Sequence, residues 1–224
     1  MRTVAAIVSA LILPVTACAA GPAGDSVSLP EHLDPSGLAT LFESRISTRL
    51  FESAPLDAPA VSTVLWAGCG LLDDGRMTVP SAGAIYPLEL YLVSGGVEGL
   101  EPGIYSYDSR GGSLSMIASG DARAALSTAC LGQPWVASAP ASVVICARPG
   151  RTTARYGDRG ISFVWMEAGH SSQNIYLMCA ALGLGTVAVG AFDDSLVSSV
   201  IGLDEGVVPL YVMPFGHPAS GAGM

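Results

Sequence analysis

Two arginines and a serine stand close together in the segment Arg45-Ile46-Ser47-Thr48-Arg49. Two guanidinium groups separated by one turn of chain, with a hydroxyl group between them, can form a compact clamp for an anion. Guanidinium donors are planar and charged, so they match the oxygen atoms of a phosphate group. The same residues also suit a solvated basic turn, and so short a segment does not decide between the two.

Two later segments could present backbone N–H groups to a ligand. Small side chains in Pro80-Ser81-Ala82-Gly83 let a flat ligand approach the backbone just before a predicted strand. The segment Gly190-Ala191-Phe192-Asp193-Asp194 lies between a buried predicted strand and a predicted helix, where free N–H groups can reach ligand atoms. The plain alternatives are a turn that leads into a strand and a loop that ends in an aspartate N-cap.

Hydrophobic periodicity and turn residues predict the elements that position these segments. Helices are expected over residues 37–43, 60–69, 122–131, 161–182 and 195–201, with Asp57, Asp121 and Asp194 as N-caps. Strands are expected over residues 88–93, 104–107, 114–117, 142–147, 186–189 and 208–215. Helices and strands do not alternate strictly, which favours an α+β fold with one central sheet. The helix over 161–182 is apolar nearly all round, so we expect burial on every side.

The composition excludes several classes of function. Of the 224 residues, 50% are hydrophobic and 13% are charged, which permits a sizeable core and indicates a large subunit interface. The formal net charge is -9, and all ten basic residues are arginines. A chain without clustered positive charge is a poor nucleic-acid binder. A chain without lysine has no Schiff-base or lysine general-base mechanism.

The N-terminus predicts export. Arg2 is followed by an apolar run from Val4 to Val15, which is too short for a membrane-spanning helix of about 20 residues and is typical of a secretory signal. The segment Val15-Thr16-Ala17-Cys18 resembles a bacterial lipobox, with Cys18 as the lipidated residue. The alternative is an ordinary signal peptide that is cut near Ala19 or Ala20.

These observations divide the chain into three parts. Residues 1–18 are interpreted as a signal peptide of the lipoprotein type, residues 19–35 as a flexible tether, and residues 36–224 as one domain. The protein is then expected to be exported, either as a lipid-anchored protein of the membrane or cell surface or as a periplasmic one. A lipid anchor would be its only contact with the membrane.

The remaining cysteines, His170 and Glu167 are interpreted as structural residues, and no metal site is predicted. No cluster of histidines, cysteines or carboxylates has metal-ligand spacing, so we expect no metal. The cysteines after Cys18 stand in apolar stretches and are expected to be buried thiols, although an oxidising compartment would permit disulfides. They are Cys69, Cys130, Cys146 and Cys179. His170 is interpreted as a core residue of the long helix, and Glu167 as an acid that faces a dimer seam or an arginine.

Taken together and in this order, the three segments resemble the nitroreductase-like family of flavoproteins. Its members carry R-x-S-x-R near the start, P-S-x-G before the first main strand and a G-x-F-D-type segment late in the chain. Three further stretches look like the branch that includes the azoline-oxidising dehydrogenases of thiazole and oxazole peptide biosynthesis. These stretches are Val79–Glu89, Gly132–Trp135 and Glu167–Asn174, and the resemblance covers about residues 41–218.

The resemblance implies a three-layer fold with a central mixed, mainly antiparallel sheet, flanking helices and an obligate homodimer. Two FMN sites would lie at the dimer interface, each built from both chains. The flavin phosphate and pyrimidine edge would be bound by Arg45, Ser47 and Arg49. The partner chain would lay Pro80, Ser81, Ala82 and Gly83 along the isoalloxazine ring. The N–H of Ala191, with Gly190 beside it, would donate to flavin N5.

The function implied is that of an FMN-dependent oxidoreductase. It would transfer a hydride between the flavin and a small-molecule or peptide-derived substrate, with NAD(P)H or another compound as electron donor or acceptor. The alternative is an exported binding or scaffold protein of the same fold that has lost redox turnover. In either case the substrate and the catalytic residue stay unassigned.

Two departures from the family bear on these expectations. The azoline dehydrogenases use a lysine and a tyrosine near the flavin, whereas this chain has no lysine and offers only Tyr86, Tyr156 and Arg159 as replacements. Many members also carry basic residues near the end that complete the phosphate site. This chain has His217 there, and a neutral histidine binds anions less strongly than an arginine does.

Overall fold

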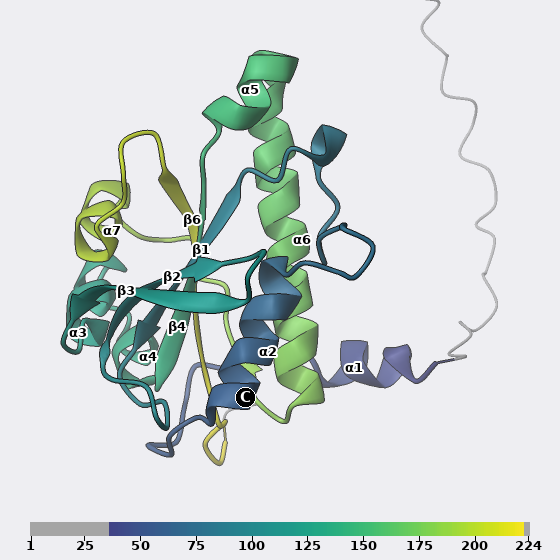
Figure 1. Ribbon diagram of the computed structural model, residues 1–224. Coiled ribbons are helices and arrows are strands. Elements are labelled where there is room, and N and C mark those ends of the chain that lie inside the picture. Colours follow the sequence, from purple (N-terminus) through teal and green to yellow (C-terminus); the bar gives the residue numbers. More distant parts are fainter. Residues whose placement is uncertain (1–35, 222–224) are drawn as a thin grey trace, which may run out of the picture. The chain divides into compact units, whose positions relative to one another are not determined.

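A computed structural model describes residues 36–221 of the chain. Six strands form one sheet at the centre of this fold (Figure 1). They are β1 (Leu88–Ser94), β2 (Gly103–Asp108), β3 (Ser113–Ser119), β4 (Ala141–Ala147), β5 (Gly185–Thr186) and β6 (Val208–Gly216). Their order across the sheet is β3-β2-β1-β4-β6-β5, and each pairing between these strands is antiparallel. Parallel pairing occurs at isolated bridges, such as that from Ser47 to Thr186.

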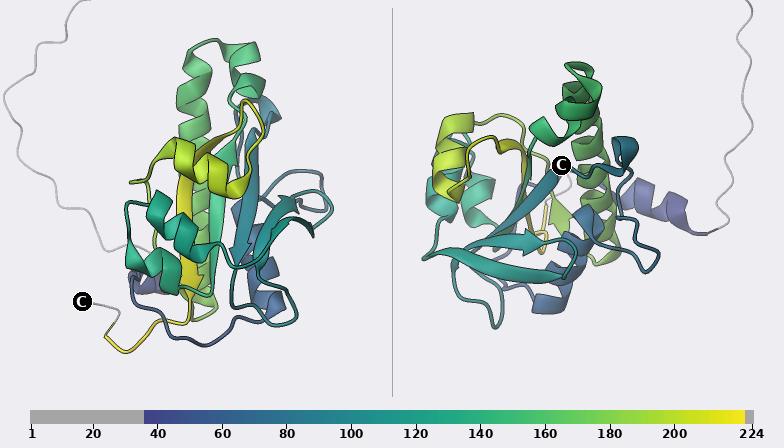
Figure 2. Two further views of the ribbon diagram at one scale, coloured as in Figure 1. Left: turned by 90° about the vertical axis from the view of Figure 1, so that its left-hand side faces the viewer. Right: turned by 45° about the horizontal axis from the view of Figure 1, so that its top comes forward.

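Helices cover both faces of this sheet. They are α1 (Leu38–Ser44), α2 (Ala58–Cys69), α3 (Arg123–Ala129), α4 (Pro134–Ser138), α5 (Gly150–Tyr156), α6 (Arg159–Ala181) and α7 (Asp194–Ile201), and the short 3-10 helix η1 (Ala82–Ala84) precedes β1. α2 and α6 lie on one face, whereas α3, α4 and α7 lie on the other (Figures 1 and 2). The three layers confirm the expected α+β fold with a mainly antiparallel sheet.

The hydrophobic core consists of two clusters, one on each face of the sheet, and the side chains of β1 alternate between them. Leu88, Leu90 and Leu92 pack with residues of α2 and α6, whereas Tyr91 and Val93 pack with residues of α3 and α7. Successive side chains of a strand point to opposite faces, so one strand serves both clusters. β4 pairs with β1 and β6 in the middle of the sheet and is buried at every position, as its apolar, β-branched sequence predicts.

The cysteines behave as expected. The four that were interpreted as thiols are buried and form no disulfide: Cys69, Cys130, Cys146 and Cys179. Burial in apolar surroundings raises the pKa of the Cys69 and Cys130 thiols to about 11, so neither is poised as a nucleophile at neutral pH.

The long helix departs from the expectation of burial on every side. α6 buries one face, which includes Val164, Ala168 and Ile175. On the outer side, Trp165 and Met166 are 63% and 51% exposed. The apolar pattern correctly predicts that α6 needs cover, but the sheet and helices of a single chain cover only part of its circumference.

Two helix starts differ from the predicted caps. Asp57 caps α2 as expected, and its carboxylate accepts a hydrogen bond from the first turn at 2.7 Å. The cap of α7 is Asp193, whose carboxylate accepts at 2.9 Å, and Asp194 is the first residue of the helix. Asp121 lies one residue before the N-cap of α3 and binds Arg123 instead. Neighbouring aspartates have equal capping propensity, so the backbone path decides which one serves.

The predicted signal peptide over residues 1–18 and the tether over residues 19–35 lie outside the described residues. Within residues 36–221, no helix is long and apolar enough to cross a membrane. We correct the interpretation as a lipoprotein with a signal peptide. Half of the whole chain is hydrophobic, so one short apolar run distinguishes a signal poorly from the rest of the sequence.

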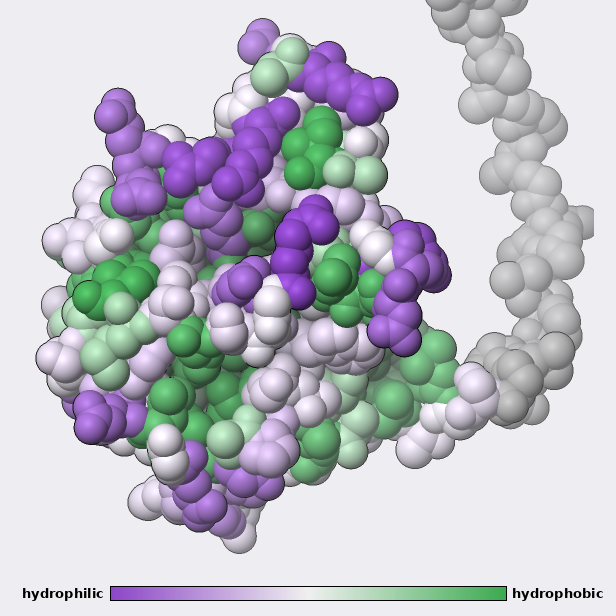
Figure 3. All heavy atoms as spheres, viewed as in Figure 1, coloured by the Kyte–Doolittle hydropathy of each residue, from purple (hydrophilic) through white to green (hydrophobic). Residues whose placement is uncertain are grey.

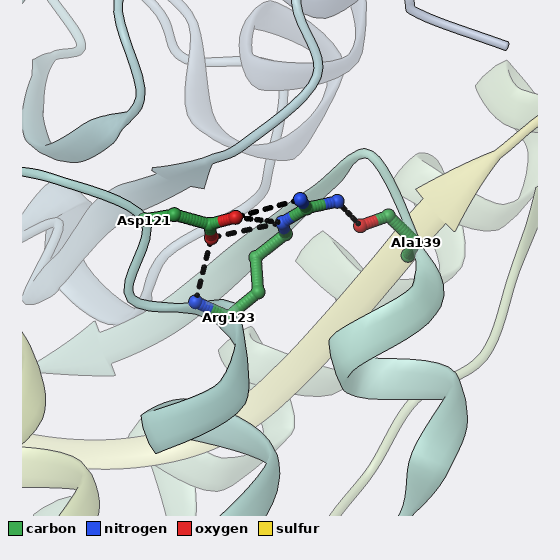
Figure 4. A network of polar contacts seen from close by, with 3 residues as sticks. All are labelled: Asp121, Arg123 and Ala139. Atoms are coloured by element: carbon green, nitrogen blue, oxygen red, sulfur yellow. Dashed lines mark hydrogen bonds and ion pairs between the residues drawn. The ribbon is translucent and has the colours of Figure 1, made fainter. Parts of the chain in front are cut away.

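Arg123 joins the start of α3 to the segment after α4, through Asp121 and Ala139 (Figure 4). Its guanidinium group donates to both carboxylate oxygens of Asp121, at 2.7 to 3.2 Å, and to the Ala139 carbonyl at 3.1 Å. The hydrogen bonds from Arg123 hold the pKa of the Asp121 carboxyl below its ordinary value. A β-carbon at Gly95 would collide with the guanidinium group, so glycine at this position lets Arg123 lie there.

We expect Arg123→Ala to lower the free energy of unfolding by about 1–3 kcal/mol, because charge-assisted hydrogen bonds to Asp121 and the Ala139 carbonyl are lost. Urea denaturation followed by circular dichroism measures the change. Arg76→Ala is the matched control, since the ion pair of Arg76 with Asp74 is exposed and such pairs contribute little. Equal losses in the two variants would contradict the role given to Arg123.

Candidate functional site

The R-x-S-x-R segment is held at the β5 edge of the sheet. Ser47 forms a parallel bridge with Thr186, and the Thr48 N–H donates to the Thr186 carbonyl at 2.9 Å. A β-carbon at Gly185 would lie 2.5 Å from the Thr48 hydroxyl oxygen. Only glycine at position 185 therefore lets the segment approach β5 this closely.

Tyr176 of α6 organises the first half of the clamp. Its hydroxyl group is 3.0 Å from the Ser47 hydroxyl and accepts a hydrogen bond from the Ala188 N–H at 2.8 Å. The Arg45 guanidinium carbon lies 5.1 Å from the centre of the Tyr176 ring, which is the geometry of a cation–π contact. Tyr176 thus positions both Arg45 and Ser47. Apart from its place on the long helix, no pattern in the residues singles it out.

The Gly132–Trp135 stretch connects the first segment with the third. The Arg49 guanidinium carbon lies 5.5 Å from the Trp135 ring centre. The Gln133 side-chain amide donates to the Ala191 carbonyl at 2.8 Å and to the Cys130 carbonyl at 2.8 Å. This stretch, which resembles that of the family, therefore places Trp135 against Arg49 and Gln133 against the Ala191 carbonyl.

Neither clamp arginine is neutralised by the chain itself. Among residues 36–221, the arginines in ion pairs are Arg76, Arg123, Arg148 and Arg151. Arg45 and Arg49 have aromatic rings beside them in place of carboxylates. Arg110, Arg155 and Arg159 also have no ion pair among the described residues. What distinguishes Arg45 and Arg49 is that they flank one serine on a single segment, where two unpaired guanidinium groups can bind one anion.

His217 follows β6 and is half-buried. Its carbonyl accepts from the Glu52 N–H at 2.9 Å, and the Ala219 N–H donates to the Leu50 carbonyl at 3.0 Å. The end of β6 therefore runs beside the segment that follows Arg49, where a basic residue that completed the clamp would lie.

The Pro80–Gly83 loop has a strained backbone. Gly83, Ala84 and Tyr86 have φ angles of 63°, 53° and 53°, and non-glycine residues pay about 1–3 kcal/mol for such conformations. The Ser81 hydroxyl group accepts from the Tyr86 N–H at 2.9 Å and helps to hold the loop. Strain of this kind is usual where a loop is shaped for a ligand.

The end of α5 packs against this loop. A β-carbon at Gly83 would lie 2.6 Å from the Tyr156 hydroxyl oxygen and 2.7 Å from an Arg155 nitrogen. Of the three residues suggested as replacements for the missing lysine, only Tyr156 has its polar atom at Gly83. Tyr86 lines a different cavity, and Arg159 lies over the Phe163 ring.

One chain does not bring all the predicted residues together. The loop cavity, of about 280 Å³, is lined by residues that include Ser81, Phe163 and Glu167. A second cavity, of about 390 Å³, is lined by residues that include Trp165 and Gly190. Phe163 and Glu167 share one face of α6 while Trp165 lies on the other, because residues four apart are neighbours on a helix. The clamp and Gly190-Ala191 are linked to each other, and the loop is separate from them.

Glu167 is a buried acid without a basic partner. It is 2% exposed, and its Oε1 atom has no hydrogen-bond partner among the described residues. Burial raises its pKa from the ordinary 4.5 to about 7, against the opposing effect of a hydrogen bond with Ser81. Of the two expected surroundings, an arginine is not found, because no arginine among the described residues pairs with Glu167, and the dimer seam stays a prediction. His170, expected in the core, is exposed beside the loop cavity, because it lies on the outer part of α6.

No group of three or more histidine, cysteine or acidic residues within residues 36–221 could hold a metal ion. The candidate site offers arginines, aromatic rings, backbone N–H groups and one buried carboxyl.

Comparisons with known proteins agree with these features. The profile of the Nitroreductase family matches residues 42–217. A protein of Methanocaldococcus jannaschii with the provisional name nitroreductase is 41% identical over 192 residues, which covers 85% of this chain and 96% of that protein. The microcin B17-processing protein McbC of Escherichia coli is 27% identical over 196 residues, which covers 81% of this chain and 66% of that protein.

Solved structures share the fold. The crystal structure of a provisionally named nitroreductase from Ralstonia eutropha matches with a TM-score of 0.72 at 30% identity, and covers 86% of this chain and 89% of that one. A chain of the E. coli microcin synthetase McbBCD complex, with truncated pro-MccB17 bound, matches with a TM-score of 0.72 at 22% identity, and covers 98% of this chain and 85% of that one. None of these descriptions supports a signal peptide or a lipoprotein.

The raised pKa of Glu167 makes stability depend on pH. The folded chain holds this proton more tightly than the unfolded chain, so the stabilisation is complete below about pH 4.5 and is lost as the pH rises through about 7. We expect wild-type protein to lose on the order of 3 kcal/mol from this group between pH 5 and pH 8. Glu167→Gln should remove most of this dependence of stability on pH, and the variant should be more stable than wild type at pH 8.

Urea denaturation at both pH values measures this effect. Glu98→Gln is the control, because Glu98 is exposed, and it should keep the wild-type dependence. A Glu167→Gln variant whose stability falls between pH 5 and pH 8 as much as that of wild type would refute the assignment.

Proposed function

The chain belongs to the nitroreductase family, and from this premise we propose that it is an FMN-dependent oxidoreductase that works as a homodimer. Its reaction moves two electrons, as a hydride, between the flavin and a small-molecule or peptide-derived substrate. The observation that carries the proposal is the arginine clamp. Among residues 36–221, Arg45 and Arg49 have no carboxylate partner and lie over the rings of Tyr176 and Trp135. Gln133, two residues before Trp135, bonds to the Ala191 carbonyl.

The residues of the clamp fit the parts of FMN. Arg45 and Arg49 supply the positive charge that a phosphate requires, and Ser47 supplies a hydroxyl group between them. Gln133 holds the Ala191 carbonyl, and no described group accepts the Ala191 N–H. That N–H is free to donate to a ring nitrogen. When bound, FMN supplies the hydride chemistry, and the chain supplies position and charge.

Exposed apolar side chains support the homodimer. Phe42 of α1, Trp66 of α2 and Trp165 of α6 are 52%, 41% and 63% exposed. Figure 3 shows hydrophobic residues gathered over α1, near α2 and α6. Large exposed apolar patches are rare on monomers. A second copy would cover these helices and bring its Pro80–Gly83 loop to the clamp, from which the first chain's own loop is separated by α6.

We expect purified wild-type protein to be yellow, with flavin absorption, and the double variant Arg45→Ala, Arg49→Ala to lose bound FMN. Without both charges the phosphate has no strong partner, so the affinity should fall by about 100-fold or more. Titration of apoprotein with FMN, followed by flavin fluorescence, measures the change. Arg76→Ala should bind FMN as wild type does. A colourless wild-type protein that also takes up no added FMN would refute the proposal.

The same titration tests the role of Tyr176. Tyr176→Phe keeps the ring beneath Arg45 but loses the bonds to Ser47 and the Ala188 N–H. We expect about tenfold weaker FMN binding, which corresponds to about 1.4 kcal/mol. Tyr107→Phe, on β2 and away from the clamp, is the matched control. An unchanged affinity in Tyr176→Phe would show that the clamp does not depend on this hydroxyl group.

One measurement, the bleaching and recovery of flavin colour, distinguishes the proposal from the alternative of a protein of this fold without redox turnover. An enzyme's bound flavin is bleached by a donor such as NAD(P)H or by a substrate and recovers its colour with an acceptor. A scaffold protein would hold FMN tightly and show neither change.

A further inference from the structure

The first residues of β1 have an open edge. β1 pairs with β4 over its whole length, Leu88–Ser94, but with β2 only over Tyr91–Ser94. On the β2 side, no strand within residues 36–221 pairs with Leu88–Leu90. An open edge in the interior of a sheet is unusual, because it leaves backbone groups that require partners.

The register shows which groups face this edge. The Arg148 N–H donates to the Pro87 carbonyl at 2.9 Å, so Pro87 points toward β4. Backbone groups alternate along a strand, so Leu88 directs both its N–H and its carbonyl away from β4, toward the open edge. No backbone group outside the helices and strands of the described residues bonds to either group, and the register with β2 begins only at Tyr91. Leu88 thus presents one donor and one acceptor side by side, which is the pattern that an added strand satisfies.

The open edge borders a cavity, which we call the β1 cleft. Its volume is about 460 Å³, and its walls include Tyr86, Leu88, Tyr107, Arg110 and Arg151. Such a volume is typical of ligand sites. Arg151 is paired with Glu89 at 2.8 Å, whereas Arg110 has no ion pair among the described residues. The cleft therefore offers strand-edge hydrogen bonds, tyrosine rings and a free guanidinium group.

The β1 cleft is a separate cavity from the one at the proposed flavin loop, but two contacts connect the cleft with that loop. Tyr86 lines the cleft, and its N–H is bonded to Ser81 of that loop. Arg151 lines the cleft too, and Arg155, one turn later on α5, donates to the Gly83 carbonyl at 3.4 Å. A chain lying along β1 would therefore leave the cleft beside the flavin loop.

We propose that the β1 cleft binds an extended peptide segment of the substrate, which adds to the open edge of β1 by main-chain hydrogen bonds at Leu88. This inference rests on the proposed function and narrows the substrate class to peptides. Strand addition recognises the peptide backbone, so it tolerates many sequences. A small molecule without a paired N–H and carbonyl would leave Leu88 unsatisfied.

The test uses the full-length protein with FMN and a fluorescein-labelled peptide of alternating serine and glycine, and fluorescence anisotropy reports binding. Ser106 of β2 lines the cleft, and its cross-strand partner Ser115 of β3 does not. Ser106→Phe should weaken peptide binding by about tenfold or more, because it fills the cleft, and Ser115→Phe should leave it unchanged. The same peptide with N-methyl groups at alternate residues should not bind.

A second pair of variants tests the backbone group directly. Leu88→Pro removes the N–H at the open edge and no bond to β4, whereas Leu88→Val keeps that N–H. Peptide binding should be lost in the first variant and kept in the second. Should Leu88→Pro not fold, the N-methylated peptide tests the same hydrogen bonds on wild-type protein.

The outcomes separate this inference from the proposed function. A yellow, reducible wild-type protein that does not bind the peptide overturns the cleft alone, as does binding that survives Ser106→Phe or N-methylation. A protein that binds the peptide at the cleft but takes up no FMN defeats the proposed oxidoreductase and leaves the cleft standing.

Discussion

The hydroxyl group of Tyr176 is the contact on which the candidate site depends. It bonds to Ser47 in the first segment and to the Ala188 N–H on the chain that leads to Gly190, while its ring supports Arg45. α6 is long and packs against α2 and the sheet, so Tyr176 stands on a rigid support. Together with the bond from the Thr48 N–H to the Thr186 carbonyl, this contact gives two segments that are distant in sequence a fixed spacing, which is what a rigid, flat ligand requires.

Local sequence signals predicted the elements well where local forces decide them. The apolar runs of β1 and β4, the turn between β2 and β3, and the cap at Asp57 each depend on residues within a few positions. Prediction failed where distant contacts decide. The strand expected over 186–189 stops at Thr186 and resumes only as a bridge from Val189 to Val212, because pairing with β6 sets its length. The cap of α7 moved by one residue for the same kind of reason.

The residues of the candidate site divide in the same way. Residue type and spacing were enough to single out the clamp, the small-residue loop and the Gly190-Ala191 segment, and the family match confirms the resemblance built on them. Their assignment to parts of FMN stays a prediction. The supporting residues could not be found from sequence, because Tyr176 lies 129 positions from Ser47 and Gln133 lies 58 positions from Ala191. Such contacts leave no local pattern.

Strain and exposure in this chain have one common explanation. Ala84 and Tyr86 hold left-handed conformations that cost free energy. The loop next to them lies apart from the arginine clamp of the same chain. Trp165 is exposed on the face of α6 that points away from the loop cavity. A monomer gains nothing from either feature. In the proposed homodimer the preformed loop would meet the partner's clamp, and burial of the apolar helices would offset the cost of holding the loop in place.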